Sequence, residues 1–205
     1  MRSTSIVVSV CTVAVAAALT ARPAFAGPPL VCFPFDIGHA RSLPILDRGY
    51  GAPDPKYDLS RLVPDTLELL DPKAPVIVHM ETIRRAALYA KDNAKAGEML
   101  LTAIEKRAAT PGADAPVNVF DFGYLVETYR QAGVALPSNV DGYVWVQKAI
   151  ALKNDPQMEF AAAIISAWPR RADHAEHVRL ATAAAPRDEL LGRNLSGHLP
   201  GTEQR

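Results

Sequence analysis

The sequence predicts an all-α protein of stacked helical hairpins, capped by a proline-rich irregular N-terminal arm. Pro75, Pro116 and Pro156 lie 41 and 40 residues apart, and each opens a stretch patterned as a helix, a break and a second helix. That phasing is typical of a helical repeat array, in which one helical pair buries its apolar face only by stacking on its neighbours. Such arrays mostly serve as binding surfaces.

The N-terminus has the features of a secretory signal peptide. Arg2 supplies a positive charge, residues 6–19 form an almost unbroken apolar run, and residues 24–26 (Ala-Phe-Ala) form a small-x-small cleavage site before Gly27. The run of 14 residues is shorter than the roughly 20 that span a bilayer core. We therefore predict residues 1–26 to be a cleaved signal peptide, and the product to be periplasmic or secreted without a stable membrane anchor.

The charge balance excludes the classes of protein that depend on a strongly basic surface. Two of the 22 basic residues, Arg2 and Arg22, lie in the predicted signal, so 20 basic residues stand against 22 acidic ones in the remaining 179 residues. A chain this close to neutral lacks the positive field that nucleic acid or an anionic membrane surface selects. We expect no nucleic-acid partner.

Residues 27–75 are predicted to form the arm. Eight prolines before Pro75 fix the backbone and disfavour helix: Pro28, Pro29, Pro34, Pro44, Pro53, Pro55, Pro64 and Pro72. One short helix fits between Pro64, a good first-turn residue, and Pro72. We expect residues 27–60 to lie across the helical body and cap it, because their apolar side chains require burial: Leu30, Phe33, Phe35, Ile37 and Leu43.

Residues 76–192 are predicted to form the helical-repeat domain. After Pro75, apolar residues recur at three- and four-residue steps up to Ala90, and a second helix follows a polar break at residues 91–93. After Pro116 a helix with two apolar faces runs until Gly133 and Pro137 interrupt it.

The next helix is expected to start at an N-cap formed by Ser138 or Asn139 and to end before Pro156. The third unit runs from Pro156 to Trp168, and Asp173 then caps a helix that ends near Pro186. Residues 193–205 show no periodicity and are predicted to be a loose tail.

Aligning the units on their prolines supports the period. A bulky, a small and a bulky residue recur in register, which lets neighbouring helices approach closely. The three sets are His79, Phe120 and Phe160, then Thr82, Gly123 and Ala163, then Ile83, Tyr124 and Ile164. The alternative is coincidence among alanine-rich helices.

Two resemblances accompany this pattern. Residues 151–156 (Ala-Leu-Lys-Asn-Asp-Pro) resemble the end of helix B in tetratricopeptide repeats, although the Trp-Leu-Gly-Tyr part of the helix-A signature is not present. Residues 27–32, 36–44, 80–86 and 124–129 resemble blocks of a family of uncharacterised exported bacterial proteins. The first resemblance implies a tetratricopeptide-like or related α-solenoid; the second implies a bacterial secretory origin and no known activity.

Cys32 is the one cysteine that remains after the predicted cleavage, so no disulfide forms within the chain. It follows Val31 and not the small residue that lipoprotein processing needs. The thiol is either buried and inert, paired with a second molecule, or reactive. Asp36 and His39 lie within eight residues of Cys32, and a thiol near an imidazole suits a cysteine nucleophile or a soft-metal site. The alternative is a buried thiol beside a surface histidine.

His174 and His177 are spaced to share one face of the last helix. They bind a transition metal only if a third ligand comes from elsewhere. The alternative is solvated helix surface, because the spacing differs from the His-Glu-x-x-His motif of zinc proteases.

Six aromatic residues gather between residues 120 and 145. Such a cluster either lines a peptide groove or forms core, and we choose four of the residues as the candidate binding surface: Tyr124, Tyr129, Tyr143 and Trp145. Two polar pairs, Glu81 with Arg85 and Glu127 with Gln131, are expected to support their helices.

No phosphate loop, Gly-x-Ser-x-Gly motif or dinucleotide fingerprint is present in the sequence. We expect no cofactor. The sequence therefore favours a module that binds a protein or peptide, with a homodimer as a further possibility. The alternative is a thiol-dependent enzyme or a metal-binding protein centred on Cys32 and His39.

Overall fold

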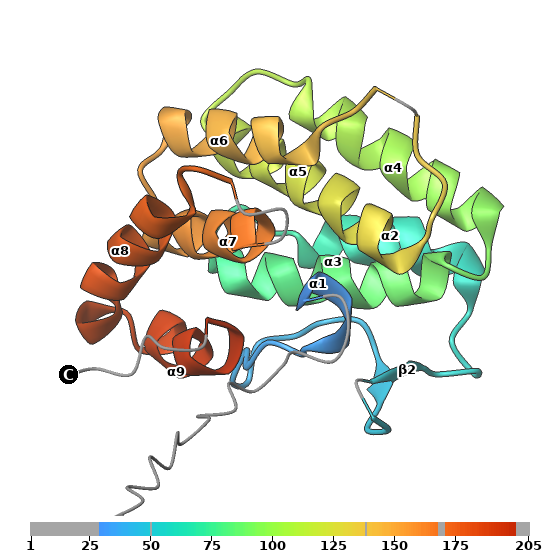
Figure 1. The fold of residues 1–205 in the computed structure, drawn as a ribbon. Helices are drawn as coiled ribbons and strands as arrows, with labels where there is room; N and C mark the ends of the chain where they lie inside the picture. The colour runs from blue at the N-terminus through green and yellow to red at the C-terminus, as the bar shows by residue number, and fades with distance from the viewer. Residues whose placement is uncertain (1–28, 50, 138, 168–170, 200–205) are drawn as a thin grey trace, which may run out of the picture.

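The computed structural model describes residues 29–49, 51–137, 139–167 and 171–199, and this part of the chain is mostly helical (Figure 1). The all-α prediction is confirmed. The predicted signal peptide, residues 1–26, lies outside the described residues. The α-helices of the described part are α1 (Pro29–Cys32), α2 (Leu62–Leu69), α3 (Val76–Ala90), α4 (Ala94–Ala108), α5 (Ala115–Ala132), α6 (Gly142–Leu152), α7 (Pro156–Ala167), α8 (His174–Ala184) and α9 (Glu189–His198).

The shorter elements connect these helices. Strands β1 (Ile45–Leu46) and β2 (Ala52–Pro53) pair antiparallel, with Ile45 opposite Pro53 and Leu46 opposite Ala52. Single 3-10 turns, Leu59–Arg61 and Ala185–Arg187, lead into α2 and follow α8.

The three spaced prolines stand at helix starts, as their period predicts. Pro75 is the N-cap of α3, Pro116 is the second residue of α5, and Pro156 is the first residue of α7. The missing N–H of proline costs nothing there, because the first N–H groups of a helix have no partner within it. Gly133 ends α5 in the left-handed conformation, with φ of 75°.

Two boundary predictions are wrong. The N-cap of α6 is Asp141 and not Ser138 or Asn139, because the Asp141 carboxylate accepts from the N–H groups of Tyr143 and Val144. Residues 193–198 are not a loose tail but the last six residues of α9. Asp188 caps this helix, and the buried side chains of Leu191 and Leu195 hold it against the body despite its two glycines.

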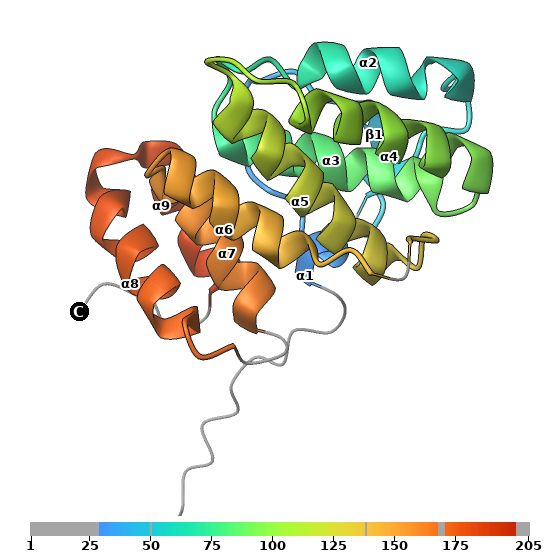
Figure 2. The same ribbon diagram turned by 90° about the horizontal axis from the view of Figure 1, so that it is seen from above.

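Helix α5 lies at the centre, packed against α3, α4 and α6, while α7 contacts α6, α8 and α9 (Figure 2). Helix α1 packs against α3, α5 and α7. In Figure 1 the helices α4 and α6 lie at the top, whereas α1 and β2 lie at the bottom beneath α3. The segment that begins with α1 covers one surface formed by α3, α5, α7 and α9, and we name this surface the inner face.

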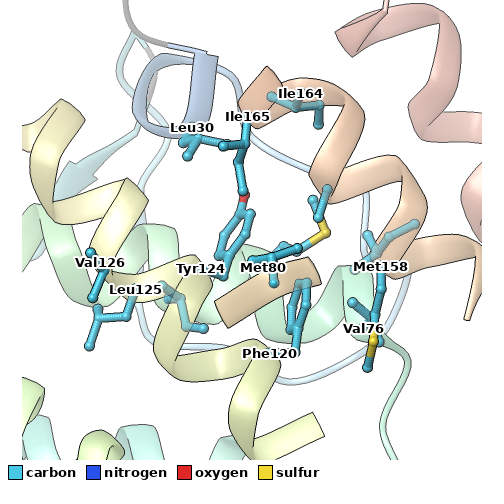
Figure 3. Packing of buried hydrophobic residues seen from close by; sticks show 14 of the residues in the cluster. Leu30, Val76, Met80, Phe120, Tyr124, Leu125, Val126, Met158, Ile164 and Ile165 are labelled. Atoms are coloured by element: carbon cyan, nitrogen blue, oxygen red, sulfur yellow. The ribbon is translucent and has the colours of Figure 1, made fainter. Parts of the chain in front are cut away.

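The core is continuous through these helices (Figure 3). Phe120 and Tyr124 of α5 stack with ring centroids 5.5 Å apart, and Met80 of α3 lies beside them. The crossing of α5 and α6 depends on a glycine pair, because a Cβ added to Gly123 would lie 2.6 Å from the carbonyl oxygen of Gly142. The absence of a side chain at both positions is what allows the two helices to approach this closely. Within the described residues, no helix combines the length and apolarity needed to span a membrane.

Candidate functional site

The polar side of α3 holds the chain's own N-terminal segment, which we define as residues 29–46. Arg84 donates to the carbonyl oxygen of Val31 at 3.0 Å, and Glu81 accepts from the N–H of Phe35 at 3.1 Å. Residues 81 and 84 are three apart and therefore lie on one side of the helix. Both bonds go to the backbone of the segment and not to its side chains.

Two further residues continue this side of α3 at four-residue steps. Arg85 donates to the carbonyl oxygen of Leu43 at 2.7 Å. The hydroxyl of Tyr89 donates to the carbonyl oxygen of Pro44, also at 2.7 Å. The same helix therefore contacts the segment's backbone from Val31 to Pro44.

Helices α5 and α9 add contacts of the same kind. The side-chain oxygen of Gln131 in α5 accepts from the N–H of Leu30 at 2.8 Å. In α9, Asn194 bonds both backbone groups of Asp36: its Oδ1 accepts from the N–H at 2.8 Å and its Nδ2 donates to the carbonyl oxygen at 2.9 Å. Three helices distant in sequence thus converge on one segment, which consists of the short helix α1 and the chain that follows it.

The Phe35 side chain enters an aromatic pocket. Its ring is 4% exposed, stacks on the ring of His198 at 4.2 Å, and meets Phe160 edge-on at 6.2 Å. Burial lowers the pKa of His198, although hydrogen bonds to the carbonyl oxygens of Asn194 and Phe33 partly offset the effect.

A buried ion cluster lies under the segment. Glu81 is 0% exposed and Arg84 is 1% exposed. Arg84 binds both carboxylate oxygens of Glu81, at 2.7 and 2.8 Å, and Arg85 adds a third bond at 2.6 Å. One carboxylate between two guanidinium groups leaves net positive charge directed at the segment's carbonyl oxygens.

The predicted surface of tyrosines is wrong. Tyr124 and Tyr129 are 0% exposed, because α5 packs against α3, α4 and α6 at once. Tyr143 of α6 is 1% exposed, and its ring lies edge-on to His177 of α8. Burial raises the pKa of Tyr124 well above its ordinary value, and the charge of Glu81 raises it further. Trp145 is half-buried, with its ring edge-on to Phe122 at 4.8 Å.

The two predicted histidine ligands point to different partners. His177 bonds Glu159 through Nδ1 at 2.5 Å and the Tyr143 hydroxyl through Nε2 at 2.8 Å. His174 instead donates from Nδ1 to the carbonyl oxygen of Ala163 at 3.0 Å. Both rings therefore tie helices together.

The candidate thiol site is spread out in the structure. Cys32 is half-buried in α1, and His39 is exposed. Asp36 forms an ion pair with Arg193 at 3.0 Å. In the described part of the chain, no three His, Cys, Asp or Glu side chains are grouped to hold a metal ion.

A polar pocket of about 280 Å³ lies between the segment and α2. Its charged groups already pair, Arg41 with Glu68 at 3.3 Å and Arg61 with Asp65 at 2.6 Å. The lining residues are Arg41, Ser42, Leu43, Pro44, Arg61, Asp65, Glu68 and Leu69.

The sequence indicated part of this site. The predicted pair of Glu81 with Arg85 is present at 2.6 Å, but Glu81 is buried and also binds the segment. The predicted partnership of Glu127 with Gln131 is wrong: Glu127 pairs with Arg130 at 2.6 Å, and Gln131 bonds the segment. The available signal in the sequence was the charge of residues 81, 84 and 85 within a mostly apolar helix.

Comparison with known proteins gives no match to a family model, a curated protein or a solved structure.

Proposed function

We propose that this chain is an exported helical-repeat protein, tetratricopeptide-like in arrangement, whose inner face binds an extended peptide segment of a partner. One observation carries the proposal: side chains of α3, α5 and α9 bond the backbone of residues 30–44. Backbone-directed bonds fit any extended peptide, and pockets for chosen side chains add selectivity.

The charge of the inner face supports a binding surface over an ordinary core. Replacing a buried ion pair by apolar residues is often neutral or stabilising, so packing alone gives no reason for Glu81 and Arg84. If this face were purely apolar, departure of the segment would expose a large apolar patch to water, which is unfavourable. The Glu81, Arg84 and Arg85 cluster would instead become solvated when the segment leaves, which offsets part of the cost of exposing the apolar residues beneath Leu30 and Phe35.

Residues 29–46 cover this face, and on this proposal they act as an intramolecular ligand. A tethered segment competes at an effective concentration of about a millimolar for a short flexible linker. The apparent affinity of a partner is then reduced in proportion to the fraction of molecules in which the face is open. Cleavage before Gly27, as we propose for an exported protein, leaves the segment attached to the body at its carboxyl end only.

The test compares partner capture by two variants of residues 27–205. Changing the inner face itself weakens the segment and the partner alike, so the informative changes lie in the segment. Leu30→Ala with Phe35→Ala opens the face. Val144→Ala with Leu152→Ala, at side chains 55% and 54% exposed on α6, is the matched control.

We expect the segment variant to capture more of a partner from the envelope and secreted fraction than the unaltered chain does. The control should capture as much as the unaltered chain, and excess free peptide of residues 29–46 should compete. Capture lost only in the α6 variant would place the binding surface on α6, and no specific capture by any form would refute the proposed function.

A further inference from the structure

We propose that the inner face selects partner peptides with leucine followed five residues later by the pair Phe-Asp, the pattern of this chain's own Leu30, Phe35 and Asp36. This inference rests on the proposed function and names the peptide class that the face accepts. In the resting protein the N-terminal segment supplies the same residues in the same places.

The pocket for the phenylalanine is shaped for a flat ring. The Phe35 and His198 rings are 5° from parallel, and the Phe35 and Phe160 rings are 86° from parallel. His198 and Phe160 also meet edge-on, at 5.8 Å. Offset stacking on one ring combined with an edge contact to another favours an aromatic side chain over an aliphatic one of similar area.

Backbone bonds fix the register of this anchor. Glu81 holds the N–H of Phe35, and Asn194 holds both backbone groups of Asp36, so the ring enters the pocket at one position only. The Asp36 carboxylate then meets Arg193 at 3.0 Å. Because both side chains of this ion pair are about half exposed, the acidic residue contributes orientation more than affinity.

The leucine site is the second anchor. Leu30 is 0% exposed, and Figure 3 shows it beside Ile165 of α7, above Tyr124 of α5. Gln131 fixes the N–H of Leu30. One helical turn, Pro29–Cys32, followed by extended chain sets the five-residue step between this site and the aromatic pocket.

The test is a binding titration with a fluorescent peptide of residues 29–46 in which Cys32→Ser removes the thiol. Fluorescence anisotropy reports binding to residues 27–205, either unaltered or with Leu30→Ala and Phe35→Ala. We expect the segment variant to bind at least about tenfold more tightly, because its face is open in a larger fraction of molecules. Circular dichroism confirms that the variant is folded.

Peptide variants test the selectivity. Phe35→Ala or Leu30→Ala in the peptide should each weaken binding at least about tenfold, because a buried anchor is lost. Phe35→Leu should weaken it less than Phe35→Ala does. His39→Ala is the matched control, since it removes a ring from an exposed position and should leave the affinity unchanged.

A second measurement uses the unaltered chain and so does not depend on a variant that folds. Excess peptide should displace the segment and speed alkylation of the half-buried Cys32 several-fold. The Phe35→Ala peptide should have no such effect.

The outcomes separate the two proposals. If the unaltered and Phe35→Ala peptides bind with the same affinity, the inner face still binds peptides, but the proposed selectivity for leucine and phenylalanine is refuted. A peptide that neither binds the segment variant nor speeds Cys32 alkylation would refute both proposals. Equal affinity for both forms of the chain would place the peptide away from the inner face and overturn the inference.

Discussion

Asn194 forms hydrogen bonds with both the backbone N–H and the carbonyl oxygen of Asp36, although the two residues lie 158 positions apart in the chain. Its amide has an acceptor oxygen and an NH2 donor group, which match the N–H and the carbonyl oxygen of a single residue in extended chain, and the NH2 group also donates to the carbonyl oxygen of Leu190. The C-terminal helix α9 and the N-terminal segment are therefore tied directly to one another. Loss of this contact should weaken the attachment of both the N-terminal segment and α9 to the rest of the fold.

Asn194→Ala should release the segment while the helical body stays folded. We expect a loss of about 1–3 kcal/mol in the local stability of the segment, because two bonds in a mostly buried site are removed. Trypsin cleavage after the exposed Arg41 should become faster. The control is Asn139→Ala at an exposed loop position, and equal cleavage rates for the two variants would contradict the assignment.

His79 is buried between two acceptors. Its Nδ1 meets the Asp121 carboxylate at 2.8 Å and its Nε2 meets the carbonyl oxygen of Asp71 at 2.9 Å. A neutral imidazole donates only one bond, so both contacts are satisfied only by the protonated ring. Burial alone would lower the pKa of His79, but the charge and hydrogen bond of Asp121 outweigh it and raise the pKa.

This raised pKa predicts how stability depends on pH. A group that binds its proton more tightly in the folded state stabilises the fold fully below its unfolded pKa, about 6.5, and loses that contribution as pH rises through the folded pKa. The stability advantage of the unaltered chain over His79→Gln should therefore shrink as pH rises above about 6.5. Urea unfolding at several pH values measures it, and a difference that grows with pH would contradict the protonated assignment.

The glycine pair at the crossing of α5 and α6 should tolerate no side chain. Gly123→Ala should destabilise the fold by about 3 kcal/mol, because the new Cβ would collide with the backbone of α6. Gly197→Ala is the matched control, since a Cβ on this exposed helical glycine meets nothing within 4 Å. That change should be neutral or stabilise by up to about 1 kcal/mol. Thermal unfolding that shows equal effects would rule out the close crossing.

Tyr124 and Tyr129 should respond in opposite ways to loss of the hydroxyl. Among the described residues the buried Tyr124 hydroxyl has no hydrogen-bond partner, whereas Tyr129 donates to the carbonyl oxygen of Gly97 at 3.2 Å. Tyr124→Phe should stabilise the fold by about 1 kcal/mol, and Tyr129→Phe should destabilise it by about the same amount. Denaturant unfolding of both variants checks this, and two changes of the same sign would count against the assigned bonding.

Local sequence signals are sufficient to predict where several of the helices start. Pro75, Pro116 and Pro156 mark helix starts through a steric rule that acts within one turn, and the structure confirms all three. The sequence does not indicate helix α9, because residues 193–205 show no apolar periodicity, while the burial of this helix comes from contacts with other parts of the chain.

The sequence does not predict the inner face either, because the contacts that form it join residues far apart in the chain. The bonds from Gln131 to Leu30 and from Asn194 to Asp36 join residues 101 and 158 positions apart, and neither leaves a local pattern. Periodicity placed Tyr124 correctly on an apolar side of α5 but does not distinguish a helix surrounded by neighbours from one that lines an open surface.

Amide hydrogen exchange of the unaltered chain tests the central claim most directly, because it measures whether the N-terminal segment opens independently of the body. The account predicts that the N–H groups of Leu30, Phe35 and Asp36 exchange at least about 100-fold faster than those in the middle of α5, with rates unchanged by low denaturant. If the segment and α5 exchange together, through global unfolding only, residues 29–46 are an inseparable part of the core. That result would contradict the proposal that the segment is a displaceable ligand.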